Sequence, residues 1–160
     1  MRDIECGFAD ADGLPGYQHL IIYGPVIGVQ IGYDNTYDPK ILGTIPKINQ
    51  EQYVALIDTG ATTSSIDRNL ADKLGLQIID RGPLMVGSGV QEFNLYLAQV
   101  YIPRLNHTIY GEFHGVHLSD ENGNGLYKAI LGRNFLAHFK MVYEGWTGSV
   151  KLTSRLVIPS

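Results

Sequence analysis

Apolar residues alternate with small or polar residues along most of the chain, and this pattern predicts strands. Residues 24–33 alternate in this way and predict a half-buried strand. A glycine-rich turn near residue 87 lies between two apolar arms, which predict a hairpin. Further strands are expected at residues 53–57, 62–66, 76–79, 98–103, 108–118, 140–144 and 149–152. Asn106 and His107 are expected to form the turn between two of them.

Helix signals are confined to two short segments. Asp67 is suited to cap a helix that Gly75 would end. A second helix is expected over residues 133–139. Residues 34–50 carry Asn, Asp, Gly and two prolines and predict a long loop. The pattern therefore predicts an all-β protein with one or two short helices.

Composition narrows the class of protein. A chain of 160 residues, 44% hydrophobic and 18% charged, is long and apolar enough for one folded domain. The formal net charge is −4 and the Lys and Arg residues are scattered, so nucleic acid is not expected as a partner. No apolar run approaches the roughly 18 residues of a membrane span, so no membrane partner is expected either.

Cysteine use bears on the cellular compartment. Cys6 is the only cysteine, so no internal disulfide is possible. This fits a reducing compartment, and we expect a cytoplasmic location. Export after removal of a signal segment, or release from a larger precursor, stays open.

The most informative segment is residues 53–61, Tyr-Val-Ala-Leu-Ile-Asp-Thr-Gly-Ala. An apolar strand there leads directly into an acid, Asp58, followed by Thr59 and Gly60. A buried carboxylate is costly unless it is paired or neutralised, so a carboxylate in this position indicates a function. Gly60 would let another backbone approach closely.

Two further segments stand in a fixed order after Asp58. The glycine-rich tip at residues 84–91 comes first, and residues 129–136, Ala-Ile-Leu-Gly-Arg-Asn-Phe-Leu, come second. Together the three segments resemble the active-site loop, flap and supporting segment of the retropepsin-like (retroviral-type) aspartic proteases. The resemblance covers about residues 25–152 of a single domain, 1–160, with an insertion loop at about 34–50. It implies a closed, barrel-like β fold of the retropepsin (acid protease) type.

The resemblance also implies roles for individual residues. The catalytic loop would consist of Asp58, Thr59 and Gly60. Substrate would contact residues after this loop and in the flap, namely Ala61, Thr62, Thr63, Met85, Val86, Gly87, Ser88, Gly89 and Val90. The site would be supported from beneath by Ile130, Leu131, Gly132, Arg133 and Asn134. No metal and no cofactor are expected.

One Asp-Thr-Gly per chain points to a homodimer. Aspartic protease chemistry needs two carboxyl groups about one water, and a two-fold axis would bring together Asp58 from two copies. We therefore expect an aspartic endopeptidase, active as a homodimer, that cuts extended peptide or protein segments with bulky apolar residues. By resemblance, Thr59 would bond to backbone of the other subunit. The alternative is a catalytically silent module of the same fold that binds peptide or dimerises.

Thr62 departs from the family pattern. Retroviral enzymes usually have an aspartate there, paired with the arginine of the Gly-Arg-Asn segment. Arg133 therefore needs another acceptor, and Asp67, the Asp10/Asp12 pair or backbone carbonyls are the candidates. A metal site at His114 and His117 is not expected, because residues three apart on a strand face opposite sides.

Overall fold

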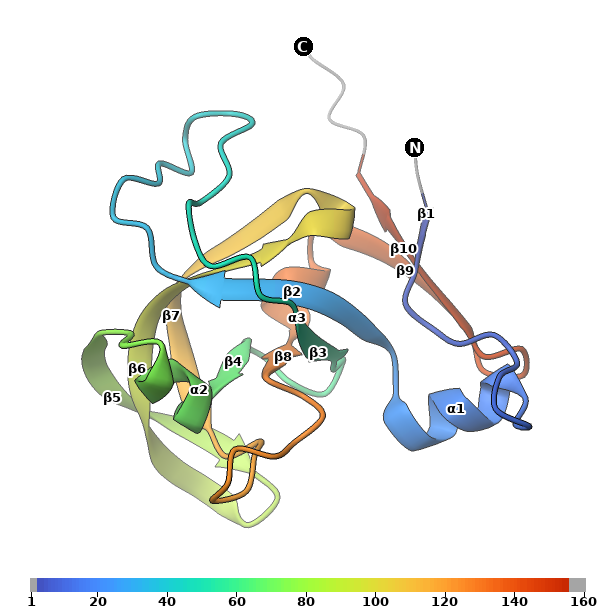
Figure 1. Cartoon of the computed structure of the whole chain (residues 1–160). Helices are drawn as coiled ribbons and strands as arrows, with labels where there is room; N and C mark the ends of the chain where they lie inside the picture. Colours follow the sequence, from blue (N-terminus) through green and yellow to red (C-terminus); the bar gives the residue numbers. More distant parts are fainter. Residues whose placement is uncertain (1–2, 156–160) are drawn as a thin grey trace.

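The computed structural model describes residues 3–155, in which strands are far more extensive than helices (Figure 1). The strands are β1 (Asp3–Glu5), β2 (Val26–Gly32), β3 (Tyr53–Ile57), β4 (Ser65–Asp67), β5 (Ile78–Val86), β6 (Gly89–Ile102), β7 (His107–Val116), β8 (Ala129–Leu131), β9 (Phe139–Glu144) and β10 (Ser149–Ser154). The helices are α1 (Gly16–Tyr23), α2 (Arg68–Lys73) and α3 (Arg133–Leu136), with a 3₁₀ turn, η1, at Pro103–Leu105.

Seven strands form one sheet in the order β2-β3-β8-β4-β7-β6-β5, and β2 also pairs with β6. The extra pairing closes the sheet into a ring, with β5 attached outside it. The predicted all-β, closed, barrel-like fold is therefore confirmed. Two pairings in the ring are parallel, β3 with β8 and β4 with β7, so segments far apart in the sequence meet at the same end of the barrel.

The barrel interior is filled by apolar side chains from every part of the ring. Ile31, Ile66, Val100 and Leu131 have no exposed surface. Tyr96 is also fully buried, and its hydroxyl donates to a carboxylate oxygen of Asp72 on α2 at 2.6 Å. This hydrogen bond satisfies the one polar atom of the Tyr96 side chain and ties α2 to the barrel.

A second, smaller sheet has the order β1-β10-β9 and joins the two ends of the described chain (Figure 1). Ile4 of β1 lies opposite Leu152 of β10, and both side chains are buried. Cys6 follows β1 and is 1% exposed, and burial raises the pKa of its thiol to about 11. The outer edge of this sheet is β9, which pairs only with β10.

Several element boundaries differ from those expected. Strand β4 is confined to Ser65–Asp67 because residues 58–64 are held in the loop described below. The expected helix over residues 133–139 stops at Leu136, since Phe139 already belongs to β9. Asn106 is in the left-handed conformation expected of a turn, but His107 begins β7. Helix α1 was not expected at all.

The long segment between β2 and β3 contains no helix or strand, as predicted for residues 34–50. Asp34 anchors it. Its carboxylate accepts hydrogen bonds from the backbone of Thr36 at 2.9 Å and of Lys47 at 2.8 Å, and its own amide donates to Gln99 of β6 at 2.6 Å. Within residues 3–155, no helix is long and apolar enough to cross a membrane.

His107 is expected to make the stability of the barrel depend on pH. Its ring lies among Phe135, His138 and Phe139, with centroids 5.1–6.0 Å away. Burial, aided by the neighbouring His138, lowers the pKa of His107 from its usual 6.5 to about 4. The unfolded chain therefore takes up a proton below pH 6.5 that the folded chain takes up only near pH 4. Stability contributed by neutral His107 should be lost as the pH falls through this range.

We expect urea unfolding at pH 7, 5.5 and 4 to show about 2 kcal/mol of this loss, a value reduced for the partial exposure of the ring. The His107→Gln variant should lose less stability over the same range. His138→Gln is the control, because burial is the larger cause of the shift and remains in that variant. An equal pH dependence in the wild type and His107→Gln would contradict the prediction.

Candidate active site

Strand β3 places Asp58 at its carboxyl end. The Asp58 amide donates to the carbonyl of Leu131 on β8 at 2.9 Å, which continues the parallel pairing by one residue. One carboxylate oxygen of Asp58 accepts from the amide of Gly60 at 2.8 Å. The side chain of Asp58 is half-buried, while Thr59 and Gly60 are exposed. The loop thus presents a carboxylate at the surface of the barrel.

The loop is held from beneath by β8 and α3. The amide of Arg133 donates to the carbonyl of Ala61 at 2.8 Å, and the amide of Asn134 donates to the carbonyl of Thr62 at 3.2 Å. Gly132 lies directly under the loop. A Cβ atom there would meet the carbonyl oxygens of Thr63 and Ala61 at 2.5 and 2.8 Å. Only glycine fits this contact without displacing backbone.

Ser64 is a supporting residue that sequence reasoning did not assign to the site. Its hydroxyl donates to the side-chain oxygen of Asn134 at 2.8 Å and accepts from the amide of Gly132 at 3.1 Å. The residue is 1% exposed. Nothing in the sequence around Ser64 reveals partners about seventy residues away.

The Arg133 side chain donates hydrogen bonds to acceptors on the Asp58 loop itself. One guanidinium nitrogen donates to the carbonyl of Thr59 at 2.8 Å and another to the hydroxyl of Thr62 at 2.9 Å. Of the acceptors considered above, backbone carbonyl is correct. Asp67 caps α2 through the amide of Leu70, and Asp10 accepts from the amide of Gly16. The hydroxyl at position 62 thus accepts a hydrogen bond from the arginine without supplying a charge.

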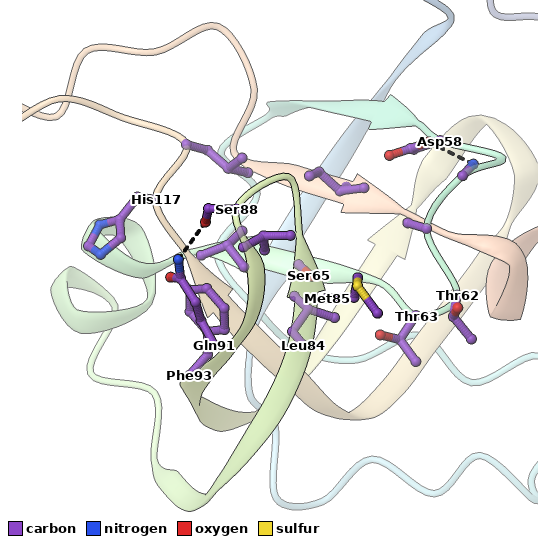
Figure 2. A pocket seen from close by; sticks show the side chains of 16 residues that line it. Asp58, Thr62, Thr63, Ser65, Leu84, Met85, Ser88, Gln91, Phe93 and His117 are labelled. Carbon is purple, nitrogen blue, oxygen red and sulfur yellow. Dashed lines mark hydrogen bonds between the residues drawn. The ribbon is translucent and has the colours of Figure 1, made fainter.

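A pocket of about 750 Å³ opens between the Asp58 loop and the β5–β6 hairpin (Figure 2). Residues from the loop, the hairpin, the end of β7 and β8 line it. They are Asp58, Gly60, Ala61, Thr62, Thr63, Ser65, Leu84, Met85, Val86, Ser88, Gln91, Phe93, Val116, His117, Leu118 and Ile130. Most of these side chains are apolar or carry a hydroxyl. The pocket is large enough for several residues of a peptide.

The β5–β6 hairpin turns at Gly87 and Ser88. Val86 pairs with Gly89, whose φ of 113° is in the region that favours glycine. Met85 and Val90 pair across the strands and are 76% and 64% exposed. This hairpin therefore carries unburied apolar side chains at the mouth of the pocket.

A family model described as "gag-polyprotein putative aspartyl protease" matches residues 46–138. The chain belongs to this aspartyl protease family. The matched region contains the Asp58 loop, the hairpin at residue 87 and the Gly132-Arg133-Asn134 segment. The retropepsin-like resemblance is therefore confirmed. No curated protein matches the chain.

The site residues expected from the resemblance can be compared with the residues that line the pocket. Nine residues expected at the site line the pocket: Asp58, Gly60, Ala61, Thr62, Thr63, Met85, Val86, Ser88 and Ile130. Thr59, Gly87, Gly89 and Val90 are not among the lining residues, and Leu131 to Asn134 lie beneath the loop. Lining residues that were not expected are Ser65, Leu84, Gln91, Phe93, Val116, His117 and Leu118.

Two ionisable side chains line the pocket. Asp58 lies at one end and His117 at the other (Figure 2). Among residues 3–155, Asp58 is the only one that contributes a carboxylate to the lining. Among residues 3–155, no three His, Cys, Asp or Glu side chains cluster in a way that could hold a metal ion.

Proposed function

We propose that the chain is an aspartic endopeptidase that is active as a homodimer. The observation that carries this proposal is the single carboxylate, Asp58, in a peptide-sized pocket. One carboxyl group cannot both take a proton from water and donate one to the substrate. A second copy would supply the missing group, since a two-fold axis beside the exposed Thr59 and Gly60 would bring two Asp58 side chains together.

The two Asp58 carboxyl groups then take different roles in the reaction, one as a base and one as an acid. Two acids this close share one proton, because both cannot ionise easily. The ionised Asp58 removes a proton from the water, whose oxygen attacks the peptide carbonyl carbon. The protonated Asp58 donates to the carbonyl oxygen. When the tetrahedral intermediate collapses, a proton passes to the amide nitrogen, the C–N bond breaks, and a carboxylic acid and an amine leave.

The pocket lining supports an extended, apolar substrate. Leu84, Val86, Phe93, Val116 and Ile130 provide an apolar surface between the loop and the hairpin. In an extended peptide, alternate side chains point to the same side, so apolar residues near the cleaved bond would enter this surface. The exposed tip of the hairpin would close over the peptide and exclude water.

The environment of the Thr63 hydroxyl supports a role of this residue in binding substrate. Its hydroxyl is buried and has no hydrogen-bond partner among residues 3–155, although the residue lines the pocket. An unsatisfied buried hydroxyl is costly in the free protein. A polar group of the substrate would remove that cost.

The Thr63→Val variant is expected to keep or slightly raise stability while kcat/KM falls about 3- to 30-fold, the value of about one hydrogen bond. Thermal melting and peptide cleavage would be measured together. Thr44→Val is the matched control, because the Thr44 hydroxyl bonds only within the loop before β3. Unchanged kcat/KM in Thr63→Val would show that substrate does not use this hydroxyl.

Mixing subunits tests the proposed function directly. Wild-type protein at a fixed concentration is incubated with increasing Asp58→Asn protein, and cleavage of a peptide mixture is followed. If the site needs an aspartate from each copy, mixed dimers are inactive and cleavage falls as the variant is added. Activity should also fall on dilution as dimers dissociate. Cleavage that is insensitive to the added variant, with exchange of subunits verified, would overturn the homodimer.

The alternative function is a silent module that binds peptide in the same pocket. It would be supported by a protein that dimerises and binds extended apolar peptides but leaves them uncut from about pH 3 to 7, the range in which a carboxyl pair works. Any cleavage that disappears in Asp58→Asn excludes this alternative.

A further inference from the structure

Helix α1 ends shortly before β2, the strand that pairs with β3 just ahead of Asp58. It ends at Tyr23, whose carbonyl accepts a hydrogen bond from the hydroxyl of Tyr127. Two residues later, the carbonyl of Pro25 accepts from the amide of Ile57 at 2.9 Å, and Asp58 is the next residue. The carboxyl end of β3 points to the side of the molecule on which α1 lies (Figure 1). The position of α1 is thus tied by short connections to the catalytic loop.

One face of α1 packs against other residues of its own chain. Gly16, His19 and Leu20 are buried. The ring of His19 stacks on Phe8 and Tyr23 at centroid distances of 5.8 and 6.2 Å, and its Nε2 atom contacts the carbonyl oxygen of Ala11 at 2.8 Å. These contacts fix the rotation of the helix about its axis.

The opposite side of α1 is mostly apolar and uncovered, with one polar residue, the half-buried Gln18, among its side chains. Ile21 and Ile22 are 75% and 60% exposed, and Tyr17, one turn before Ile21, is 39% exposed. We call these three residues the α1 face. Neither of its isoleucines carries a polar group that would explain exposure to water. Clustered exposed apolar side chains of this kind mark surfaces that are covered by a partner.

We propose that the α1 face is a contact surface for a second copy of this chain, packed beside the paired Asp58 loops. This inference rests on the proposed homodimer. A second copy must approach Thr59 and Gly60 closely enough to bring its own Asp58 to the pocket. A molecule that approaches the Asp58 loop this closely also reaches the surface beside the loop, where α1 presents its isoleucines. The partner is therefore a copy of this chain, and burial of apolar area beside the two loops would stabilise their pairing.

Crosslinking gives the first test. A benzophenone amino acid is placed at Ile22 in the full chain and irradiated at a concentration that supports cleavage. Covalent dimers are expected. The matched control carries the same group at Leu42, which is 99% exposed. The loop between β2 and β3 that contains this residue lies on the far side of the molecule from α1 (Figure 1). Crosslinks from position 42 but not 22 would overturn the inference.

Charge substitution gives the second test. In Ile21→Glu/Ile22→Glu, the dimer dissociation constant measured by sedimentation should rise at least about tenfold, because like charges would replace buried apolar contacts. The melting temperature of the dilute, monomeric protein should not change. Ile41→Glu/Leu42→Glu is the control, since Ile41 and Leu42 are also exposed, and it should dimerise as the wild type does.

The outcomes separate this inference from the function on which it rests. Cleavage by the Ile21→Glu/Ile22→Glu protein should return when its concentration exceeds the raised dissociation constant. If this variant dimerises and cleaves as the wild type does, the α1 face is not the contact, and an edge such as β9 must serve instead. In that case the homodimeric protease still stands. A protein that cleaves as a strict monomer would overturn both.

Discussion

The Asp58→Asn variant is expected to lose peptide cleavage by at least about 10³-fold, because an amide can neither take a proton from water nor share one with a second carboxyl group. The fold should persist. Asp58 makes one side-chain hydrogen bond, from the amide of Gly60 to a carboxylate oxygen, and the amide oxygen of asparagine can accept the same bond. Activity should therefore fall without a comparable change in melting temperature.

Cleavage of a peptide mixture between about pH 3 and 7 would measure this loss. Asp38→Asn is a matched control. The carboxylate of Asp38 also accepts from the amide two residues ahead, that of Lys40, at 2.9 Å, but it lies in the loop before β3. This control should retain full activity. Cleavage by Asp58→Asn at a wild-type rate would exclude Asp58 as a catalytic residue.

The Gly132→Ala variant is expected to lose about 3 kcal/mol of stability, at the upper end of the cost of overpacking a well-packed site. The conformation at Gly132 is extended, with φ of −89°, so alanine meets no backbone strain. The cost comes from space. The new methyl group would lie 2.5 Å from the carbonyl oxygen of Thr63 and 2.8 Å from that of Ala61, and backbone cannot move aside as a side chain can.

Urea unfolding would measure this loss, and cleavage should fall with it because the displaced residues belong to the Asp58 loop. Gly87→Ala is the control for stability. Gly87 has no neighbouring atom within 4 Å of an added Cβ and no positive φ, so the change should stay within about 0.5 kcal/mol. A Gly132→Ala protein as stable as the wild type would show that the loop can shift at little cost.

The sequence reveals those parts of the site that can be recognised from a few consecutive residues. Asp58 with its two following residues, the glycine-rich tip at residue 87 and the segment from Ile130 to Asn134 are each recognisable by themselves. How these segments lie relative to one another in space cannot be recognised from the sequence. The hydroxyl of Ser64 joins two of these segments, and Val116, His117 and Leu118 reach the pocket only because β7 runs parallel to β4. A parallel pairing of two short strands leaves no periodic signal in either one.

Helix α1 shows a second limit of sequence reasoning. Its residues, Gly-Tyr-Gln-His-Leu-Ile-Ile-Tyr, include β-branched and aromatic residues that favour strands, and the residue at its N-cap, Pro15, has no capping side chain. Its apolar residues point both inward and outward, so the usual amphipathic pattern is absent. The stacking of Phe8, His19 and Tyr23 holds the helix, and such a contact is not readable from spacing alone.

The support beneath the Asp58 loop has a consequence for how the protein matures during synthesis. The loop takes its shape from the carbonyl of Leu131, the amides of Gly132 to Asn134 and the side chain of Arg133, all about seventy residues downstream. A ribosome-bound chain that has released the Asp-Thr-Gly segment still lacks every one of these groups. Because such distant contacts form late, the nascent polypeptide holds Asp58 in no defined geometry until nearly the whole barrel has emerged. For the protease proposed above, this order of folding would keep Asp58 from cutting neighbouring chains on the polysome during synthesis.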